Sequence, residues 1–251
     1  MMSGKSDELA AIIMAAGKGT RMKSDLAKVL HPIRGRAMIH YVVETAQKLG
    51  ASPIVVLVGH QKEKVMAELE GQTVRFAVQE PQLGTGHAVM CALPQLEAKN
   101  QLALILSGDV PLIGIETLKS LISHHRRTGA AATVLTARAD HPKGYGRIVR
   151  QSSGHLAAIV EERDATEELK KIDEINSGIY VFNVGDLRAT LPKLRTDNDQ
   201  REYYLTEAVR LLASSGQIVA ACEGSFQEVR GINTVAELAD ANRELPPKGI
   251  V

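Results

Sequence analysis

The sequence predicts an α/β fold in which a mostly parallel β-sheet lies between layers of helices. Apolar segments of strand length alternate with helical patterns from the N-terminus onward, as they do in successive βαβ units. The segments 54–58 and 102–106 are apolar throughout, which is typical of parallel strands buried on both faces. The chain has 251 residues, of which 44% are hydrophobic and 24% charged, so it is long enough to bury a large core.

The first half of the chain carries most of the predicted sheet. We expect strands at 9–15, 54–58, 74–78 and 102–106, with helices at 37–49, 62–69 and 117–127. The helix at 37–49 places its apolar side chains on one side and stops at Gly50, a residue suited to the left-handed conformation after a helix. The alternation of strands and helices favours right-handed crossover connections.

The second half of the chain has a different pattern. A strand at 131–136 is followed by short extended segments at 146–150, 156–160 and 175–182, which are broken by Gly, Ser and charged residues. These segments predict a smaller α+β insertion beside the sheet. A helix at 205–213, a strand at 218–221 and a helix at 235–244 complete the core, and Pro246-Pro247 ends the last helix.

Composition limits the classes of partner. With 30 Lys and Arg against 29 Asp and Glu, the net charge of +1 gives no general attraction to nucleic acid or to an anionic membrane. The longest apolar run, 9–16, is shorter than the roughly 18 residues of a membrane-spanning helix. Cys91 and Cys222 are expected as core thiols rather than as a bridge, and so few cysteines favour a reducing, cytoplasmic compartment.

A glycine-rich loop follows the first predicted strand. Ligands of doubly wound sheets bind beyond the carboxyl ends of the strands, and Gly17 and Gly19 let the backbone approach a phosphate closely. The loop lacks the third glycine of a dinucleotide fingerprint and the Gly-Lys-Ser/Thr ending of a P-loop. It carries a concentration of positive charge that suits a triphosphate, although a solvated Gly-rich turn is an alternative. The basic residues are Lys18, Arg21, Lys23 and Lys28.

Two more loops are expected at the same edge of the sheet. Gln79 begins a loop with two glycines after the third strand, and its amide can pair with the edge of a base. The alternative is a plain loop before a helix that begins near His87. Asp109 follows the fourth strand and is a candidate Mg²⁺ ligand, because Mg²⁺ prefers one or two carboxylates together with substrate phosphates. Asn233 is either its partner or the N-cap of the last helix.

Two weaker patterns are interpreted as structural. His87 and Cys91 stand four residues apart on a predicted helix, but no further ligands have the spacing of a zinc site, so core packing is expected. The run from His124 to Arg127 is expected on a solvated helix surface near a helix C-terminus, where cations are favoured.

Motifs along almost the whole chain, in the same order, resemble those of the sugar-1-phosphate nucleotidyltransferases. The resemblance is greatest to the uridyltransferase domain of the bacterial bifunctional N-acetylglucosamine-1-phosphate uridyltransferases. The motifs stand at 15–22, 82–87, 108–112, 144–148, 159–161, 174–176, 202–204 and 231–233, with Lys28 downstream of the first.

The resemblance implies a Rossmann-like fold of the nucleotide-diphospho-sugar transferase type with a small α+β sugar-binding insertion. It also implies transfer of a uridylyl group from UTP to N-acetylglucosamine 1-phosphate, giving UDP-N-acetylglucosamine and pyrophosphate, with Mg²⁺. We expect one nucleotidyltransferase domain over 1–251, with a nucleotide-binding core at 9–137, a mainly sugar-binding subdomain at 138–204 and a return to the core at 205–245. The expected partners are these two substrates, without nucleic acid or membrane, and assembly into a homo-oligomer is left open.

The resemblance also implies roles for single residues. Met14, Ala15, Ala16 and Gly17 are expected to lie against the nucleotide, and Gln79, Gly84 and Thr85 to recognise uracil. Arg21 and Lys28 are expected to bind the phosphates as catalytic groups. Ser107, Gly108 and Asp109 are expected to line the ribose and phosphate region, Asp109 and Asn233 to hold Mg²⁺, and Gly146, Glu161 and Asn176 to contact the amino sugar.

The chain departs from this family pattern in a few places. Ala27 stands where the family usually has a proline before the lysine, and Met14 replaces a leucine. The bifunctional members continue into a β-helix acetyltransferase domain that is not part of this sequence, so acetyl transfer is not expected. Two alternatives remain, a nucleotidyltransferase for another sugar 1-phosphate and an inactive sugar-nucleotide-binding regulatory subunit. The presence of Arg21, Lys28, Asp109 and Asn233 argues against the inactive subunit.

Overall fold

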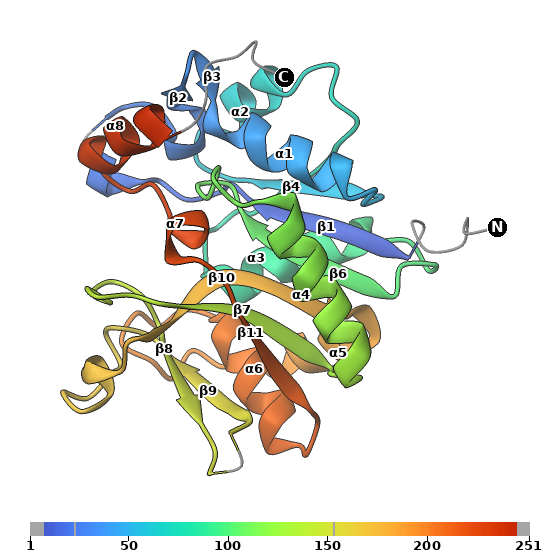
Figure 1. Cartoon of the computed structure of the whole chain (residues 1–251). Coiled ribbons are helices and arrows are strands. Elements are labelled where there is room, and N and C mark those ends of the chain that lie inside the picture. Colours follow the sequence, from blue (N-terminus) through green and yellow to red (C-terminus); the bar gives the residue numbers. More distant parts are fainter. Residues whose placement is uncertain (1–7, 23, 153, 245–251) are drawn as a thin grey trace.

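One twisted sheet passes through the middle of the molecule (Figure 1). The structure is a computed structural model that describes residues 8–22, 24–152 and 154–244. Within these residues nine strands join in the sheet, and its main path has the order β11-β7-β10-β6-β1-β4-β5. The strands are β1 Leu9–Met14, β4 Ile54–Val58, β5 Arg75–Val78, β6 Leu102–Ser107, β7 Ala132–Arg138, β8 Arg147–Arg150, β9 Leu156–Val160, β10 Glu174–Asn183 and β11 Val219–Glu223.

Parallel pairing dominates this path. In register, Ile12 of β1 lies between Val55 of β4 and Ile105 of β6, and β5 and β11 extend the sheet in parallel on its two sides. The strand β10 is antiparallel to both β6 and β7, and β8 and β9 branch from it as an antiparallel pair. The mostly parallel α/β sheet predicted from the sequence is therefore confirmed.

Helices cover both faces, and the strands alternate their side chains between two cores. Leu9, Ala11 and Ile13 of β1 join the first core, whereas Ala10 and Ile12 join the second. The first core packs against α1 Met38–Lys48, α2 Lys62–Glu68, α4 Ile115–Thr128 and α7 Phe226–Val229. The second packs against α3 Thr85–Ala92, α5 Val184–Thr190 and α6 Leu205–Ser214. No helix in the described part of the chain is both long and apolar enough to traverse a membrane.

The last described helix packs against an early part of the chain. The last helix, α8 Val235–Glu244, lies beside the hairpin of β2 Pro32–Ile33 and β3 Arg36–Ala37, as Figure 1 shows at the upper left. A small cluster of Ile33, Met38, Ile232 and Ala241 holds these parts together. Short 3₁₀ turns complete the chain at Thr20–Met22, Lys28–Leu30, Leu93–Gln95, Leu169–Lys171 and Leu191–Lys193.

Most predicted elements are confirmed, and several details differ. The segment expected at 175–182 within the flanking insertion is β10, which lies inside the main sheet. The helix expected near His87 begins at Thr85, and α5 and α7 were not predicted. The division into 9–137, 138–204 and 205–245 stays a prediction. Lys23 and Pro246-Pro247, to which we also assigned roles, lie outside the described residues.

The solvated surface expected for 124–127 is wrong for His125. Its side chain is buried, with Nδ1 2.9 Å from Thr133 Oγ1 and Nε2 3.1 Å from Asn183 Oδ1. Burial lowers the pKa of this imidazole, so the neutral ring is favoured as a core hydrogen-bonding group. Cys91 and Cys222 are free, partly buried thiols.

Candidate active site

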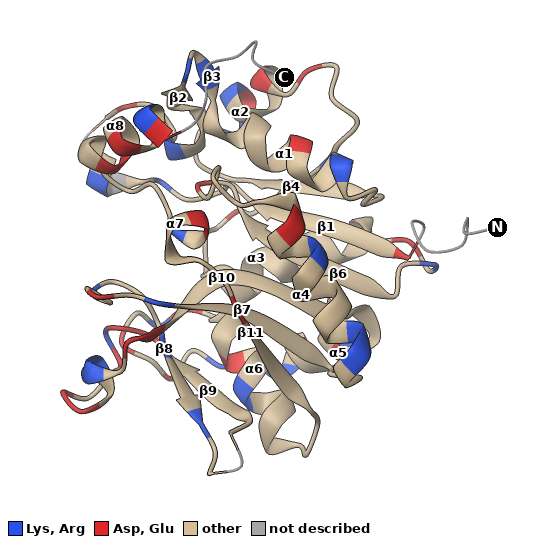
Figure 2. Cartoon of the chain, in the orientation of Figure 1, with Lys and Arg blue, Asp and Glu red and all other residues tan. Residues whose placement is uncertain are grey.

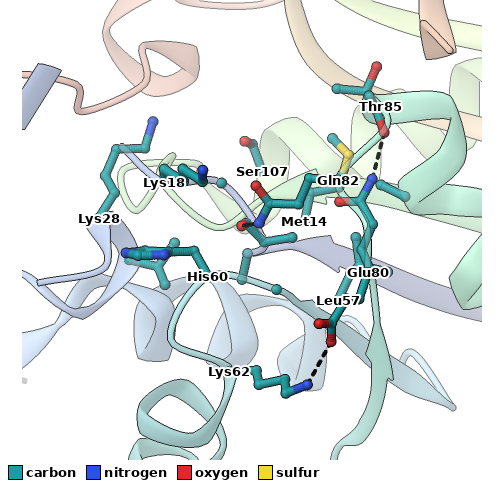
Figure 3. Close-up of a pocket in the computed structure, with 18 of the residues that line it drawn as sticks. Met14, Lys18, Lys28, Leu57, His60, Lys62, Glu80, Gln82, Thr85 and Ser107 are labelled. Atoms are coloured by element: carbon teal, nitrogen blue, oxygen red, sulfur yellow. Dashed lines mark hydrogen bonds and ion pairs between the residues drawn. The ribbon is translucent and has the colours of Figure 1, made fainter. Parts of the chain in front are cut away.

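A cavity of about 920 Å³ opens at the carboxyl ends of β1, β4, β5 and β6 (Figure 3). The three predicted loops meet here, because parallel neighbouring strands all end at this edge of the sheet. Ten of the predicted site residues line the cavity: Met14, Ala15, Ala16, Gly17, Lys28, Gln79, Gly84, Thr85, Ser107 and Asp109.

Lys28 and Asp109 make an ion pair at one side of this cavity. Lys28 opens the short turn after the glycine-rich loop, and Asp109 follows β6. The Lys28 ammonium also donates to Asn233 Oδ1 at 2.9 Å, and Arg21 Nη2 donates to the same oxygen at 2.7 Å. Four residues that are far apart in the sequence, Arg21, Lys28, Asp109 and Asn233, thus form one polar cluster, although Arg21 and Asn233 stand beyond the cavity lining.

Asp109 is held as a carboxylate. Burial alone would raise the pKa of its carboxyl, but the Lys28 ammonium and the Ser107 hydroxyl outweigh burial and hold the pKa below its ordinary value. Ser107 Oγ donates to Asp109 Oδ1 at 2.6 Å. A full negative charge therefore faces the cavity at neutral pH.

The oxygens of Asp109 and Asn233 suit a cation. Asp109 Oδ2 and Asn233 Oδ1 both contact the Lys28 ammonium, so they converge on one positive charge. A Cβ on Gly231 would lie 3.3 Å from Asp109 Oδ2 and 3.2 Å from Asn233 Nδ2, so the glycine keeps this space open. The described residues hold no group of three or more His, Cys, Asp or Glu for a metal. One carboxylate and one amide oxygen fit Mg²⁺, which takes its other ligands from water and substrate phosphates.

Asn233 is not the cap of α8. The side chain of Glu237 accepts hydrogen bonds from the backbone N–H groups of Asn233 and Thr234 at 2.7 and 2.8 Å, and Thr234 Oγ1 accepts from Glu237 N at 3.2 Å. Thr234 and Glu237 thus form the capping box. The Asn233 side chain is left to face Lys28 and Arg21, which favours the functional interpretation over the structural one.

The opposite side of the cavity is built by the loop from Gln79 to Thr85. Gln79 is buried, and its Nε2 donates to the Gly84 carbonyl at 2.9 Å. Thr85 Oγ1 accepts from Leu205 N at 2.9 Å, and Gly86 N donates to Tyr203 O at 2.6 Å. The loop is therefore fixed against 203–205, and its recognition of uracil stays a prediction.

Replacement of Gly84 by alanine is expected to destabilise the protein by about 1–3 kcal/mol. Gly84 has a φ of +103°, and an added Cβ would lie 2.7 Å from Tyr203 O and 2.8 Å from Glu202 Cβ. Urea unfolding measures the change. Gly185→Ala is the matched control, because Gly185 lies in a helix with nothing within 4 Å of its Cβ position. Equal stability of the two variants would contradict the close packing at Gly84.

The residues predicted to contact the amino sugar lie beyond this cavity but adjoin one another. Asn176 N donates to Gly146 O at 2.9 Å, and a Cβ on Gly146 would lie 3.5 Å from Glu161 Oε2. Glu161 Oε1 accepts from Thr206 Oγ1 at 3.0 Å. Because burial outweighs this bond, the pKa of the Glu161 carboxyl is raised.

Tyr145 connects this cluster to the polar cluster at Lys28. Its ring packs edge-on against Phe226 with 5.8 Å between centroids, and burial raises the pKa of its hydroxyl. A Cβ on the neighbouring Gly144 would lie 4.0 Å from Arg21 Nη1. The loop from Gly144 to Gly146 therefore reaches from the insertion to the edge of the polar cluster at Lys28.

Some cavity residues were not predicted. His60, Lys62 and Glu80 line the cavity, and Lys62 and Glu80 form an ion pair at 2.8 Å, visible at the bottom of Figure 3. Gln82 begins the motif at 82–87 but was not predicted as a site residue. Its side chain donates to the Ala16 carbonyl and links two of the loops. His60 and Lys62 follow β4, so their place after a parallel strand is the signal that could have found them.

Known proteins are similar to this chain in sequence and in fold. A match to the MobA-like NTP transferase domain covers residues 11–204. The bifunctional protein GlmU of Geotalea uraniireducens (strain Rf4) is 52% identical over 241 residues, which make up 95% of this chain and 53% of the relative. The bifunctional protein GlmU of Geobacillus thermodenitrificans (strain NG80-2) is 48% identical over 93% of this chain and 51% of the relative. The chain spans about half the length of these curated relatives.

A solved structure shares the fold at lower sequence identity. It is that of a Bacillus anthracis protein assigned as a glucose-1-phosphate thymidylyltransferase, in complex with sucrose, with a TM-score of 0.73. It is 19% identical and covers 95% of this chain and 96% of its own. At this identity the likeness concerns the fold alone. Since the domain match runs from β1 to Tyr204 and takes in most of the chain, the protein belongs to the family of MobA-like NTP transferase domains.

Proposed function

We propose that this domain transfers a uridylyl group from UTP to N-acetylglucosamine 1-phosphate, with Mg²⁺, and releases pyrophosphate. The contact of Lys28 with both Asp109 and Asn233 at the rim of the large cavity carries the proposal. It provides positive charge and metal-binding oxygens where two phosphorylated reactants would meet. The similarity to relatives named GlmU and the motifs resembling uridyltransferases support this donor and this sugar.

The reaction is an in-line displacement at phosphorus. An oxygen of the sugar phosphate forms a bond to the α-phosphorus of UTP, and the bond from that phosphorus to the oxygen bridging to the β-phosphorus breaks, so pyrophosphate leaves. The attacking phosphate is already ionised at neutral pH, so the chain need not supply a general base. Positioning and charge stabilisation are the main contributions expected of the protein.

The residues at the two sides of the cavity would divide these tasks. Lys28 and Arg21 would bind phosphate oxygens, and the loop at Gln79 would hold the base. Asp109 and Asn233 would hold Mg²⁺, which neutralises phosphate charge when it is bound. Glu161 and Asn176 would hydrogen-bond the amino sugar from the neighbouring cluster.

Replacement of Glu161 by glutamine is expected to raise the KM for N-acetylglucosamine 1-phosphate about tenfold, because a charged hydrogen bond to the sugar is lost. The same change is expected to stabilise the fold at neutral pH. The pKa of Glu161 is raised above its ordinary 4.5 by burial, so the wild-type carboxyl loses folding stability as the pH rises from about 4.5 through its folded pKa.

The stability difference between Glu161→Gln and wild type should therefore be small at pH 4 and larger at pH 7. Urea unfolding at both pH values measures it, and steady-state kinetics give the KM. Thr166→Ser, a conservative change at an exposed position of the insertion, is the control. An unchanged KM would exclude Glu161 from the sugar site, and an equal difference at both pH values would contradict the raised pKa.

The proposed function is tested by pyrophosphate release from the purified chain. We expect release with UTP and N-acetylglucosamine 1-phosphate in the presence of Mg²⁺, and none after chelation of the metal. Glucose 1-phosphate should be a poor substrate, since it leaves the polar groups that bind an acetamido group unpaired. Faster reaction with dTTP or with glucose 1-phosphate would reassign the substrates, and no release with any nucleotide and sugar phosphate would reject the enzyme.

A further inference from the structure

A second cavity, of about 610 Å³, lies at the other end of β1. Leu9 begins β1 and lines this cavity, whereas Met14 ends β1 and lines the large cavity. The second cavity therefore opens at the edge of the sheet away from the candidate active site. Its walls are the end of α1 and one side of α4, and its lining is Leu9, Lys48, Leu49, Lys119, Ile122, Ser123, Arg126 and Arg127.

The lining combines an apolar floor with a basic rim. Leu9 and Ile122 are buried, and Lys119 and Arg126 are exposed. Lys119, Ile122, Ser123 and Arg126 follow the i, i+3, i+4, i+7 spacing of one helix face. Figure 2 shows the basic positions in blue at the ends of α1 and α4. The lining holds four cationic side chains and no carboxylate.

Nearby carboxylates neutralise only part of this charge. Glu44 pairs with Lys48 at 2.9 Å and Glu116 with Lys119 at 2.8 Å, and both carboxylates lie outside the lining. Exposed ion pairs of this kind contribute about 0–1 kcal/mol, so a bound anion can compete for the two lysines. Two arginines remain, and their planar groups suit bidentate contacts with phosphate, sulfonate or carboxylate oxygens.

The helix dipole explains only part of the pattern. Cations are favoured in the last turn of a helix, which accounts for Arg126 and Arg127 at the end of α4. It does not account for Lys119 in the first half of α4, nor for the buried apolar floor between the charges. Lys48 comes from a different helix and faces the same hollow.

We propose that this second cavity binds a compact organic anion that carries two negative charges and an apolar group. The basic rim holds the charges, and Leu9, Leu49 and Ile122 contact the apolar part. Since the lining has no carboxylate to hold a metal, binding needs no divalent cation. This separates the second cavity from the candidate active site, whose anions would bind together with Mg²⁺.

1-Naphthyl phosphate, a dianion with an aromatic body, is the probe. The probe is titrated into the full chain in the presence of EDTA, and again in the presence of saturating UTP and Mg²⁺. Binding is followed by fluorescence or by calorimetry. We expect binding in both conditions, because the two cavities are separate. Inorganic phosphate should bind more weakly, since it lacks the apolar group, and higher salt should weaken binding through screening.

Charge reversal at the rim provides the decisive comparison. Lys119→Glu combined with Arg126→Glu is expected to weaken binding about tenfold or more. Arg195→Glu, a reversal at an exposed arginine outside both linings, is the matched control and should leave binding unchanged. Lys119, Arg126 and Arg195 are all exposed, so the changes should leave the fold intact. The thermal unfolding midpoint of each variant is measured to check this.

Three results would overturn the proposal. The first is equal affinity of the rim variant and wild type, and the second is displacement of the probe by UTP and Mg²⁺, which would place it in the large cavity. The third is equal affinity for inorganic phosphate, which would show that the apolar floor is not used. None of these results bears on uridylyl transfer, which is measured separately.

Discussion

Alanine at position 28 is expected to lower the turnover of uridylyl transfer about 10²-fold or more, as expected for the loss of one preorganised charge-stabilising contact. The reactants are both anions, and two like unit charges about 4 Å apart repel by roughly 4 kcal/mol at an effective dielectric constant near 20. The Lys28 ammonium stands at the cavity wall between Asp109 and Asn233, where it can offset this repulsion. Pyrophosphate release at saturating UTP, sugar phosphate and Mg²⁺ measures the turnover.

The control for this variant is Lys64→Ala, which removes an exposed lysine from α2 outside the cavity lining. Lys28→Ala also leaves the buried Asp109 carboxylate without its cation, so some loss of stability is expected. Urea unfolding separates that loss from the chemical effect, since turnover is measured well below the unfolding range. Turnover close to that of wild type would reject Lys28 as a catalytic group.

Asparagine at position 109 is expected to reduce turnover about 10³-fold and to raise the Mg²⁺ concentration needed for half-maximal rate. The amide is isosteric with the carboxylate and can still accept the bond from Ser107, but it carries no charge for the metal or for Lys28. The rate of pyrophosphate release is measured over a range of Mg²⁺ concentrations for the variant and for wild type.

Asp197→Asn, at an exposed position outside the cavity lining, is the matched control and should retain the wild-type Mg²⁺ dependence. If Asp109→Asn instead lowered the rate without moving the Mg²⁺ dependence, Asp109 would act by holding Lys28 rather than by binding metal. A wild-type rate in this variant would remove Asp109 from the site altogether.

The strands and site loops could be predicted because local pattern and general topology agree there. The segment 54–58 is apolar at every position, as a strand covered on both faces must be, and β4 has these bounds. The loops at Gly17, Gln79 and Asp109 could be brought together from sequence, since parallel strands end at one edge.

Other features depend on contacts between distant residues that no local pattern records. The strand β10 mixes apolar residues with Glu, Asn, Ser and Gly, so its sequence fits either a flanking segment or a central strand, and only its pairing with β6 and β7 decides. Arg126 and Arg127 look like any basic helix end until Lys48 is placed beside them. The burial of His125 likewise depends on Thr133 and Asn183.

The contact between Lys28 and Asn233 joins two parts of the chain that are synthesised at different times. Protein synthesis proceeds from the N-terminus, and β1, β4 and β6 are all complete before residue 110. Gly84, however, packs against Tyr203, and Lys28 donates a hydrogen bond to Asn233. A chain still growing on the ribosome cannot form the cluster of Lys28, Asp109 and Asn233 until residue 233 has emerged, so under the proposed function its unfinished copies would not consume nucleotide.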